Sequence, residues 1–511
     1  MKRRDFLRRS ATATTAMAMG PFFSMPMSRA ANRKGLEEVK PFELDEATIT
    51  DLQKFLESGK YSAVSLVRRY LERIEHIDRN GPRLNSIIEL NPDALNIARE
   101  LDRERKAKGP RGPLHGIPLL IKDNLDTHDR MATTAGSLAL VGSIPARDSF
   151  VVEKLRQAGA VILGKTNLSE WANFRSSDST SGWSGRGGLT RNPYVLDRNP
   201  SGSSSGSGVA VAASLCAAAI GTETDGSILS PSSVNGIVGV KPTVGLVSRS
   251  GIIPIAHSQD TAGPMARTVR DAAILLGAIA GVDPRDPATA QSDGRSSTDY
   301  TRFLSPDGLR GARVGVARKF SHGHDEAKKL YERAVDEMRR MGAEIIDPAD
   351  LPSHGKIGGA EFQVLLYEFK ADLNAYLAAL GPSAPVQSLQ EVIQFNERHA
   401  DRELVYFGQD TLLKAEAKGP LTEREYVEAL EKCRRLSREE GIDAIMSQHR
   451  LDAIVAPTTG PAHVTDLVHG DRGLGGSTSP AAVAGYPSIT VPLGFVSGLP
   501  VGISFFGRAF S

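Results

Sequence analysis

The apolar residues of the first third of the chain recur at helical spacing and then give way to short apolar runs. Residues 45–80 place apolar side chains three and four positions apart, and 92–107 is a more charged stretch with helical character. Continuously apolar segments follow at 116–121 and 160–163, with a helical pattern at 151–158 between them. Short apolar runs bounded by turn residues are typical of buried strands, so this part predicts alternating helices and strands.

The same alternation returns in the second half. Strand-like segments at 312–317 and 344–347 bracket an amphipathic helix at 325–341, and apolar runs at 451–457 and 489–492 predict two late strands. Helices that alternate with strands pack as layers on a sheet. The chain is therefore predicted to have an α/β fold, with a central mixed β-sheet covered by helices on both faces.

Residues 360–448 depart from this alternation, because almost the whole segment has a helical pattern. We interpret it as a helical insertion or lid on the α/β core, within a single domain at 45–511. Residues 176–208 are crowded with serine and glycine, which fits either a flexible linker or a functional loop.

The N-terminus has the pattern of an export signal. Residues 2–8 read KRRDFLR, a weakly apolar stretch occupies 11–27, and Ser28-Arg29-Ala30 offers small residues to a signal peptidase. The segment resembles a twin-arginine (Tat) signal and is too polar and too broken by glycine and proline to span a membrane. We expect a signal peptide at 1–30, a linker at 31–44, the Tat machinery as a partner, and a periplasmic or secreted protein. A basic leader with an alanine-rich tether, or an uncleaved anchor, are the alternatives.

Composition and charge exclude some functions. Of the 511 residues, 40% are hydrophobic and 24% are charged, which is ordinary for a globular protein. The formal net charge is +2, but residues 1–30 contribute six basic residues and one acidic residue, so the remainder carries −3. A near-neutral protein offers no basic field for nucleic acid. Cys216 and Cys433 belong to no C-x-x-C pair, and we expect two buried thiols.

Two glycine- and serine-rich segments carry the candidate chemistry. Residues 200–208 read PSGSSSGSG, an apolar helical pattern follows at 209–219, and residues 221–228 read GTETDGSI. Glycine lets a substrate approach the main chain, and successive free N–H groups form an anion-binding nest. Such a nest is what an oxyanion hole requires. The run at 202–206 also fits a G-x-S-x-G elbow centred on Ser204, but in a segment so rich in serine and glycine this match has little weight.

Together with GIPLLIKD at 116–123, these segments resemble the amidase signature family. In that family a lysine ends a G-x-P-x-x-x-K-D strand, a bridging serine lies in a G-S-S loop, and the nucleophile lies in a G-T-x-x-G-S turn. Here those positions are Lys122, Ser203 and Ser227, and the two serines are 24 residues apart, as in the family. The segments GVKPT at 239–243 and DTAGPMAR at 260–267 fit as well. The resemblance extends from about residue 45 to the C-terminus.

The resemblance implies amide hydrolysis through a Ser-Ser-Lys triad. Ser227 would be the nucleophile, Ser203 a bridge held in a cis peptide, and Lys122 the base, with no metal or cofactor. The residues support this division, because no histidine lies near either serine motif and a lysine buried behind an apolar strand favours its neutral form. Four backbone N–H groups are expected to form the oxyanion hole, those of Thr224, Asp225, Gly226 and Ser227.

Within the family, the sequence is most similar to bacterial peptide amidases. Ser205, Asp225 and Leu229 depart from the consensus of the wider family, and these departures point to the peptide amidases. The implied reaction converts the C-terminal amide of a peptide to carboxylate and ammonia. Other possibilities are a fatty- or aryl-amide amidase, an A subunit of the tRNA-dependent amidotransferase, and a non-catalytic exported binding protein. Family members usually continue with a C-terminal helix, which we expect to be missing after the strand predicted at 501–506.

Overall fold

The predicted strands assemble into one large mixed sheet. The computed structural model describes residues 39–321, 323–473 and 475–511. Its main strands are β1 (Ile87–Leu90), β2 (Pro118–Lys122), β3 (Val161–Thr166), β6 (Ala218–Glu223), β7 (Val238–Lys241), β8 (Thr261–Ala266), β9 (Arg313–Val316), β10 (Glu344–Ile346), β11 (Ala453–Pro457), β12 (Ser488–Val496) and β13 (Leu499–Phe506). Within the described residues they form an eleven-stranded sheet in the order β1-β3-β2-β6-β8-β7-β12-β13-β11-β9-β10.

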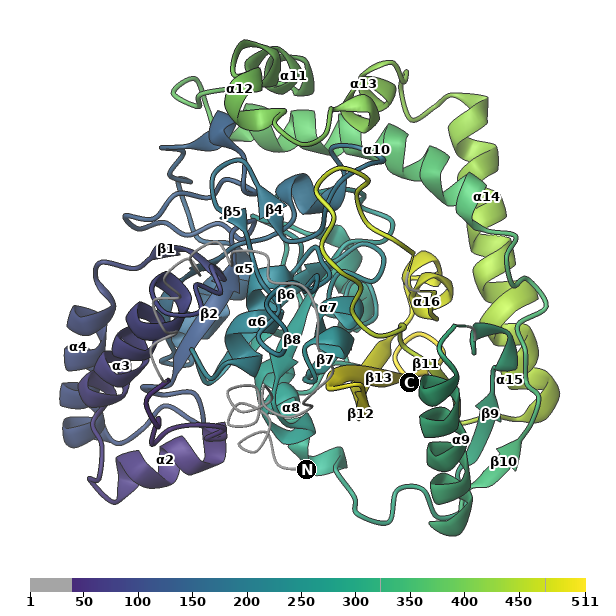
Figure 1. Ribbon diagram of the computed structural model, residues 1–511, viewed down its shortest axis with the longest axis horizontal. Coiled ribbons are helices and arrows are strands. Elements are labelled where there is room, and N and C mark those ends of the chain that lie inside the picture. Colours follow the sequence, from purple (N-terminus) through teal and green to yellow (C-terminus); the bar gives the residue numbers. More distant parts are fainter. Residues whose placement is uncertain (1–38, 322, 474) are drawn as a thin grey trace, which may run out of the picture. The chain divides into compact units, whose positions relative to one another are not determined.

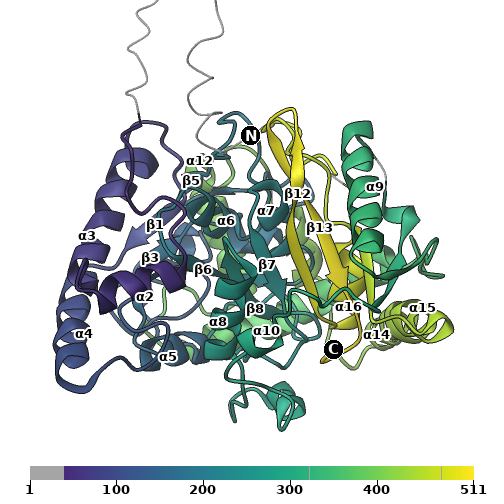
Figure 2. The same cartoon turned by 90° about the horizontal axis from the view of Figure 1, so that it is seen from below.

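The sheet has parallel segments on each side of an antiparallel centre. Strand β2 lies parallel to both β3 and β6, and β9 lies parallel to both β10 and β11. Between these groups, every neighbouring pair from β6 to β11 is antiparallel. Every residue of β2 and β6 is buried, as expected for strands covered on both faces. Figure 2 shows the long strands β12 and β13 in yellow beside β7.

Helices flank the sheet, which confirms the predicted fold class. The helices of the α/β part are α2 (Ile49–Glu57), α3 (Ala63–Arg73), α4 (Ala94–Lys108), α5 (Phe150–Gln157), α6 (Ser205–Ala212), α7 (Leu229–Val234), α8 (Val269–Ile279), α9 (Asp325–Arg340) and α16 (Thr478–Ala484). Helix α3 contacts β2 and β3, α4 contacts β3, α6 contacts β2 and β6, and α8 contacts β7 and β8. Side chains from these elements form the largest hydrophobic cluster.

The segment predicted to be helical forms the green helices of Figure 1. It contains α10 (Gly358–Ala379), α11 (Leu389–Arg398), α12 (Ala400–Glu403), α13 (Asp410–Glu416), α14 (Arg424–Ser437) and α15 (Asp443–His449). Phe369, Leu373 and Leu377 of α10 share a buried cluster with Trp171 and Ile253 of the α/β part. The insertion therefore packs on the core through apolar contacts rather than through charged surfaces alone.

One predicted element is wrong in part. The helical pattern at 209–219 ends as a helix at Ala212, and Ala218 and Ala219 begin β6. Ala219 pairs with Leu120 of β2 on one side and with Met265 of β8 on the other. Pairing on both edges overrides the helical preference of alanine, because strand formation depends more on tertiary context than on propensity.

The cysteine prediction is confirmed. Cys216 and Cys433 are both free and buried, and burial raises the pKa of each thiol to about 12. A thiol with so high a pKa is protonated and unreactive at neutral pH.

Candidate active site

Lys122 and Ser203 meet in the interior of the α/β part. Lys122 is the last residue of β2, and Ser203 lies in the loop before α6. The Lys122 Nζ atom lies 2.7 Å from the Ser203 Oγ atom, 2.9 Å from Thr222 Oγ1 and 3.2 Å from the Thr222 carbonyl oxygen. Because β2 and β6 are parallel neighbours, the end of β2 lies close to Thr222. The sheet register thus places the lysine against the serine loop.

The environment of Lys122 favours a neutral amine. The side chain is fully buried, and desolvation lowers its pKa from 10.5 to about 7, although Asp260 and Glu223 act in the opposite direction. A neutral amine has two hydrogens to donate and one lone pair to accept. The two Thr222 oxygens can accept both hydrogens, which leaves the lone pair for the hydroxyl of Ser203. The expected desolvation of this lysine is confirmed.

The serine loop is held by its own backbone and side chains. The Gly202–Ser203 peptide is cis, as the family resemblance implies. The Ser203 carbonyl accepts a hydrogen bond from the Ser169 N–H at 3.1 Å. Ser204 donates its N–H to the Ser227 carbonyl at 3.1 Å, and its hydroxyl donates to the Thr222 carbonyl at 3.0 Å. The Ser204 hydroxyl is therefore engaged with the backbone of β6, and its N–H joins the loop to the residue predicted to be the nucleophile.

The predicted oxyanion turn connects β6 to α7. Thr224, Gly226 and Ser227 are buried and Asp225 is half-buried. Gly226 has a φ of +76°, in the left-handed region that glycine adopts without strain. The Glu223 carboxylate accepts hydrogen bonds from the backbone N–H groups of Ile228 and Leu229 at 2.7 and 2.9 Å. The residues before and after the turn are thereby tied to each other.

Contacts from distant segments hold the same turn. Gln259 donates from Nε2 to the Thr224 carbonyl at 3.2 Å and to Glu361 Oε1 at 3.1 Å. Thr478 at the start of α16 donates to the Asp225 carboxylate at 2.8 Å. Burial and the nearby Asp225 raise the pKa of Glu361 well above its usual range, which favours the protonated acid. The helical insertion thus reaches the turn through Glu361 of α10.

Sequence reasoning did not single out Thr222, Asp260 and Glu361 as parts of this site. Thr222 lies inside the G-T-x-x-G-S motif, and Asp260 begins the supporting segment 260–267, so the motifs contained a signal for both. Glu361 carries no local signal, because only the packing of α10 brings it to Gln259, 102 residues away.

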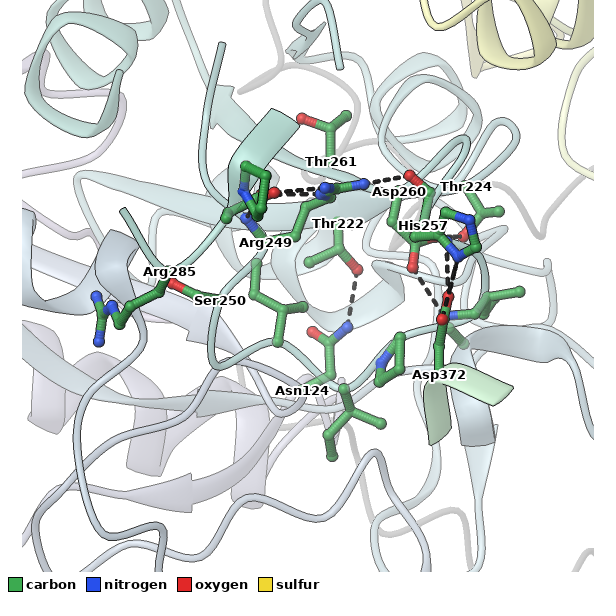
Figure 3. A pocket seen from close by; sticks show the side chains of 17 residues that line it. Asn124, Thr222, Thr224, Arg249, Ser250, His257, Asp260, Thr261, Arg285 and Asp372 are labelled. Carbon is green, nitrogen blue, oxygen red and sulfur yellow. Dashed lines mark hydrogen bonds and ion pairs between the residues drawn. The ribbon is translucent and has the colours of Figure 1, made fainter. Parts of the chain in front are cut away.

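A cavity of about 280 Å³ opens beside these residues (Figure 3). Its polar floor contains Asn124, Thr222, Thr224 and Asp260, and Asn124 donates from Nδ2 to Thr222 Oγ1 at 3.0 Å. The remaining lining has an apolar wall, two hydroxyl residues and a charged rim. The wall consists of Ala172, Ile252, Ile253, Pro254, Ile255 and Pro287, the hydroxyl residues are Ser250 and Thr261, and the rim consists of Arg249, His257, Arg285, Asp286 and Asp372.

At this rim, His257, Asp372 and Glu368 form the cluster of the described residues whose ligand atoms lie close enough to hold a metal ion. The His257 Nδ1 atom lies 2.9 Å from Asp372 Oδ2, and its Nε2 atom lies 3.4 Å from Glu368 Oε1. Asp372 above all raises the pKa of His257, although burial opposes it. The contacts with Asp372 and Glu368 thus favour the protonated form of His257.

The sequence profile of the amidase family matches residues 65–511. The chain belongs to the amidase family. A probable amidase from Arabidopsis thaliana is 47% identical over 479 residues, covering 92% of this chain and 88% of the relative. A putative amidase from Schizosaccharomyces pombe is 38% identical over 511 residues, covering 95% and 86%. As an amidase, the protein is an enzyme that hydrolyses carbon–nitrogen bonds of amides.

Solved amidase structures share this fold. The native peptide amidase from Stenotrophomonas maltophilia is 54% identical and superposes with a TM-score of 0.87. The match covers 92% of this chain and 94% of the peptide amidase. A complex of peptide amidase with the competitive inhibitor chymostatin gives 54% identity and a TM-score of 0.88, covering 92% and 95%. The similarity to peptide amidases inferred from the motifs is therefore present across the fold.

The predicted signal peptide lies outside the described residues, as does most of the predicted linker. In the part of the chain that the structure does describe, no helix is long and apolar enough to cross a membrane.

Proposed function

We propose that this amidase removes the C-terminal amide of peptides by a Ser-Ser-Lys mechanism, with Ser227 as nucleophile, Ser203 as bridge and Lys122 as base. The observation that carries the proposal is the 2.7 Å contact between Lys122 Nζ and Ser203 Oγ in a fully buried site. A serine hydroxyl is a weak nucleophile until a base takes its proton, and a lysine with a pKa of about 7 is such a base near neutral pH.

The reaction proceeds in two balanced halves. The Ser227 Oγ attacks the amide carbon, its proton passes to Ser203, and the Ser203 proton passes to Lys122 Nζ. Backbone N–H groups of residues 224–227 stabilise the oxyanion, where each donor contributes about 3–4 kcal/mol in the transition state. The carbon–nitrogen bond then breaks, and the Lys122 ammonium returns a proton through Ser203 to the leaving ammonia. Water hydrolyses the acyl-enzyme with the same base.

The peptide substrate is proposed from similarity and shape. The 54% identical relatives are peptide amidases, one of them bound to chymostatin. The cavity beside Thr222 and Thr224 combines polar floor groups with an apolar wall, as small-molecule sites commonly do. An A subunit of glutamyl-tRNA(Gln) amidotransferase from Synechococcus is 35% identical, so other amides are the competing substrates.

The test measures ammonia release from a C-terminally amidated dipeptide by the wild type and by Ser227→Ala. We expect release by the wild type only, with both proteins equally folded by circular dichroism. A serine-reactive fluorophosphonate should label the wild type and not the variant. Labelling without release would reject the peptide substrate and leave fatty or aryl amides. Release by Ser227→Ala would reject the assignment of the nucleophile.

The activity should have an acid limb set by Lys122. Because the base must be neutral, kcat/KM should fall about tenfold per pH unit below pH 7, where the pKa of Lys122 lies, and level off above it. The measurement is kcat/KM for the amidated dipeptide from pH 5 to 9. A profile that stays flat down to pH 5 would contradict a lysine base.

We also propose that the protein is exported through the Tat machinery to the periplasm or the medium. The proposal is supported by KRRDFLR at residues 2–8 and by the small residues before position 31. Expression of the full chain in bacteria with and without a functional Tat translocon tests it. Amidase in the periplasmic fraction of both strains would reject the Tat route.

A further inference from the structure

We infer that Asp260 is a positioning residue for the reaction, which holds the oxyanion turn through Thr224 and places an anion near the lysine base. This inference rests on the proposed function of the same site. The Thr224 hydroxyl donates to Asp260 Oδ1 at 2.5 Å. Charge-assisted hydrogen bonds of this kind are the strong ones in proteins.

The Asp260 carboxylate is itself fixed by backbone groups. Its Oδ2 atom accepts hydrogen bonds from the N–H groups of Ile255 and Ala256 at 2.8 and 2.9 Å. Asp260 directly precedes β8, whose first residue Thr261 pairs with Glu223 at the end of β6. The carboxylate therefore bridges three segments that all adjoin the turn, and Thr224 cannot turn its hydroxyl away without breaking this connection.

The charge of Asp260 also favours the ammonium form of Lys122. The charged neighbours that act on Lys122 are Asp260 and Glu223, and both raise its pKa. Burial raises the pKa of Asp260 to about 6, with Asp372 acting in the same direction, while Thr224 and the two backbone N–H groups lower it. The hydrogen bonds from Thr224 and the two backbone N–H groups thus favour the ionised form of Asp260, which is the form that can act as a counter-charge.

This arrangement stabilises the step in which Lys122 becomes charged. When the lysine accepts the proton of Ser203, a buried cation forms, and the fixed Asp260 carboxylate offsets part of its desolvation. Across the cavity, Arg249 pairs with Asp286 and His257 pairs with Asp372, so the nearby cations have their own carboxylates. Asp260 forms no salt bridge with a described residue; the Arg249 guanidinium attracts its charge from across the cavity, and the carboxylate also acts on Lys122 as a counter-charge.

The test is Asp260→Asn, which keeps the shape and removes the charge. We expect kcat to fall by roughly 10- to 100-fold with little change in KM, less than the loss of a complete oxyanion-hole donor. The acid limb should move to lower pH by about one unit, because the lysine loses a counter-charge. A purely structural role would lower kcat without moving the limb, and that result would overturn the electrostatic part of the inference.

Two further variants separate position from charge. Thr224→Val removes the hydrogen bond and keeps the carboxyl group, so kcat should fall while the acid limb moves less than in Asp260→Asn. Asp271→Asn is the matched control, because Asp271 is a buried carboxyl group of α8 that accepts a hydrogen bond from the Ile49 N–H and lies outside the lining of this cavity. It should leave both kcat and the limb unchanged. Unchanged kcat in both Asp260→Asn and Thr224→Val would overturn the inference.

The rate of fluorophosphonate labelling at each pH gives a readout that needs no amide substrate. A wild type that is labelled but releases no ammonia would reject the peptide substrate. The pH at which its labelling rate falls on the acid side would still test the role of Asp260. If the acid limb of the labelling rate lies at the same pH in the wild type and in Asp260→Asn, the proposed role of the Asp260 charge is rejected, whatever the natural substrate is.

Discussion

Lys122→Met should abolish ammonia release and leave the protein at least as stable as the wild type at pH 6. The variant keeps an unbranched side chain of similar size and removes the base, so we expect kcat to fall at least roughly 10³-fold. Stability should not fall with it, because burying an ammonium costs free energy that a thioether does not. A large loss of stability at pH 6 would show that the contacts of Lys122 contribute more free energy than its desolvation costs.

The sign of the pH effect follows from the lowered pKa of Lys122. The folded-state pKa is about 7, and the ordinary value of 10.5 applies to the unfolded chain. Between these values the unfolded state binds more protons, so the wild type gains stability as the pH rises from 7 to 10.5. Below pH 7 the folded wild type bears the full cost of burying the charged Lys122 side chain. The free energy of unfolding of Lys122→Met should therefore exceed that of the wild type most at low pH and least near pH 10.

Urea denaturation at pH 6 and pH 10 measures this difference. Lys54→Met is the matched control, because Lys54 is an exposed residue of α2 and carries no such penalty. We expect Lys54→Met to follow the wild type at both pH values and to keep full activity. A control that shifted like Lys122→Met would assign the effect to the loss of one positive charge in general.

Arg175→Met should destabilise the protein by about 3–5 kcal/mol, because it leaves buried carboxyl groups without their cation. The Arg175 side chain is fully buried, and its Nη1 atom lies 2.8 Å from Glu170 Oε1. Nη1 also donates to the Glu403 carbonyl at 2.6 Å, and Nη2 donates to the Phe407 carbonyl at 3.1 Å. The arginine thus ties the insertion to the segment before the serine loop.

Burial and a neighbouring carboxyl group already disfavour the charged form of a carboxyl group near Arg175. Burial, and then the nearby Glu170, raise the pKa of Glu403 to about 8. Loss of the arginine leaves Glu170 and Glu403 without their cation and should loosen the insertion near α12. Urea denaturation gives the stability, and limited proteolysis should cut within 400–409 in the variant and spare the wild type.

Arg398→Met is the control for this change, since Arg398 is an exposed arginine of the same insertion. It should change the free energy of unfolding by less than about 0.5 kcal/mol. Adding Glu170→Gln to Arg175→Met should restore part of the stability, because it removes an unpaired buried charge. No recovery in the double variant would indicate that the lost carbonyl contacts, rather than the charges, cause the destabilisation.

Much of the fold could be predicted from the sequence, because periodicity reports local structure. The helices at 325–341 and 92–107 are present within a residue or two as α9 and α4, and the runs at 116–121 and 160–163 are present as β2 and β3. The exception is Ala218–Ala219, where an alanine-rich segment is compatible with helix and strand, and only the pairing of β6 with β2 and β8 decides.

For the candidate site, the motifs placed Lys122 and Ser203 correctly in contact, and the resemblance implied the cis peptide before Ser203. Their catalytic roles, and that of Ser227, remain predictions. The partners of the oxyanion turn could not be read from spacing, since Asp260 and Thr224 are 36 residues apart and join only when β8 pairs with β6. Sequence patterns identify the reactive groups, and long-range packing determines what holds them.

The two edges of the sheet have a consequence for how the protein behaves at high concentration. A large sheet exposes unpaired backbone groups along its outer strands, where other chains can add on and begin aggregation. Here β1 has only four residues, with an irregular register between Ile87 and Glu89, and β10 has three, with an exposed Glu344 and Pro348 soon after. Both outer strands are short and interrupted or charged. An eleven-stranded sheet therefore presents little template for intermolecular strand addition.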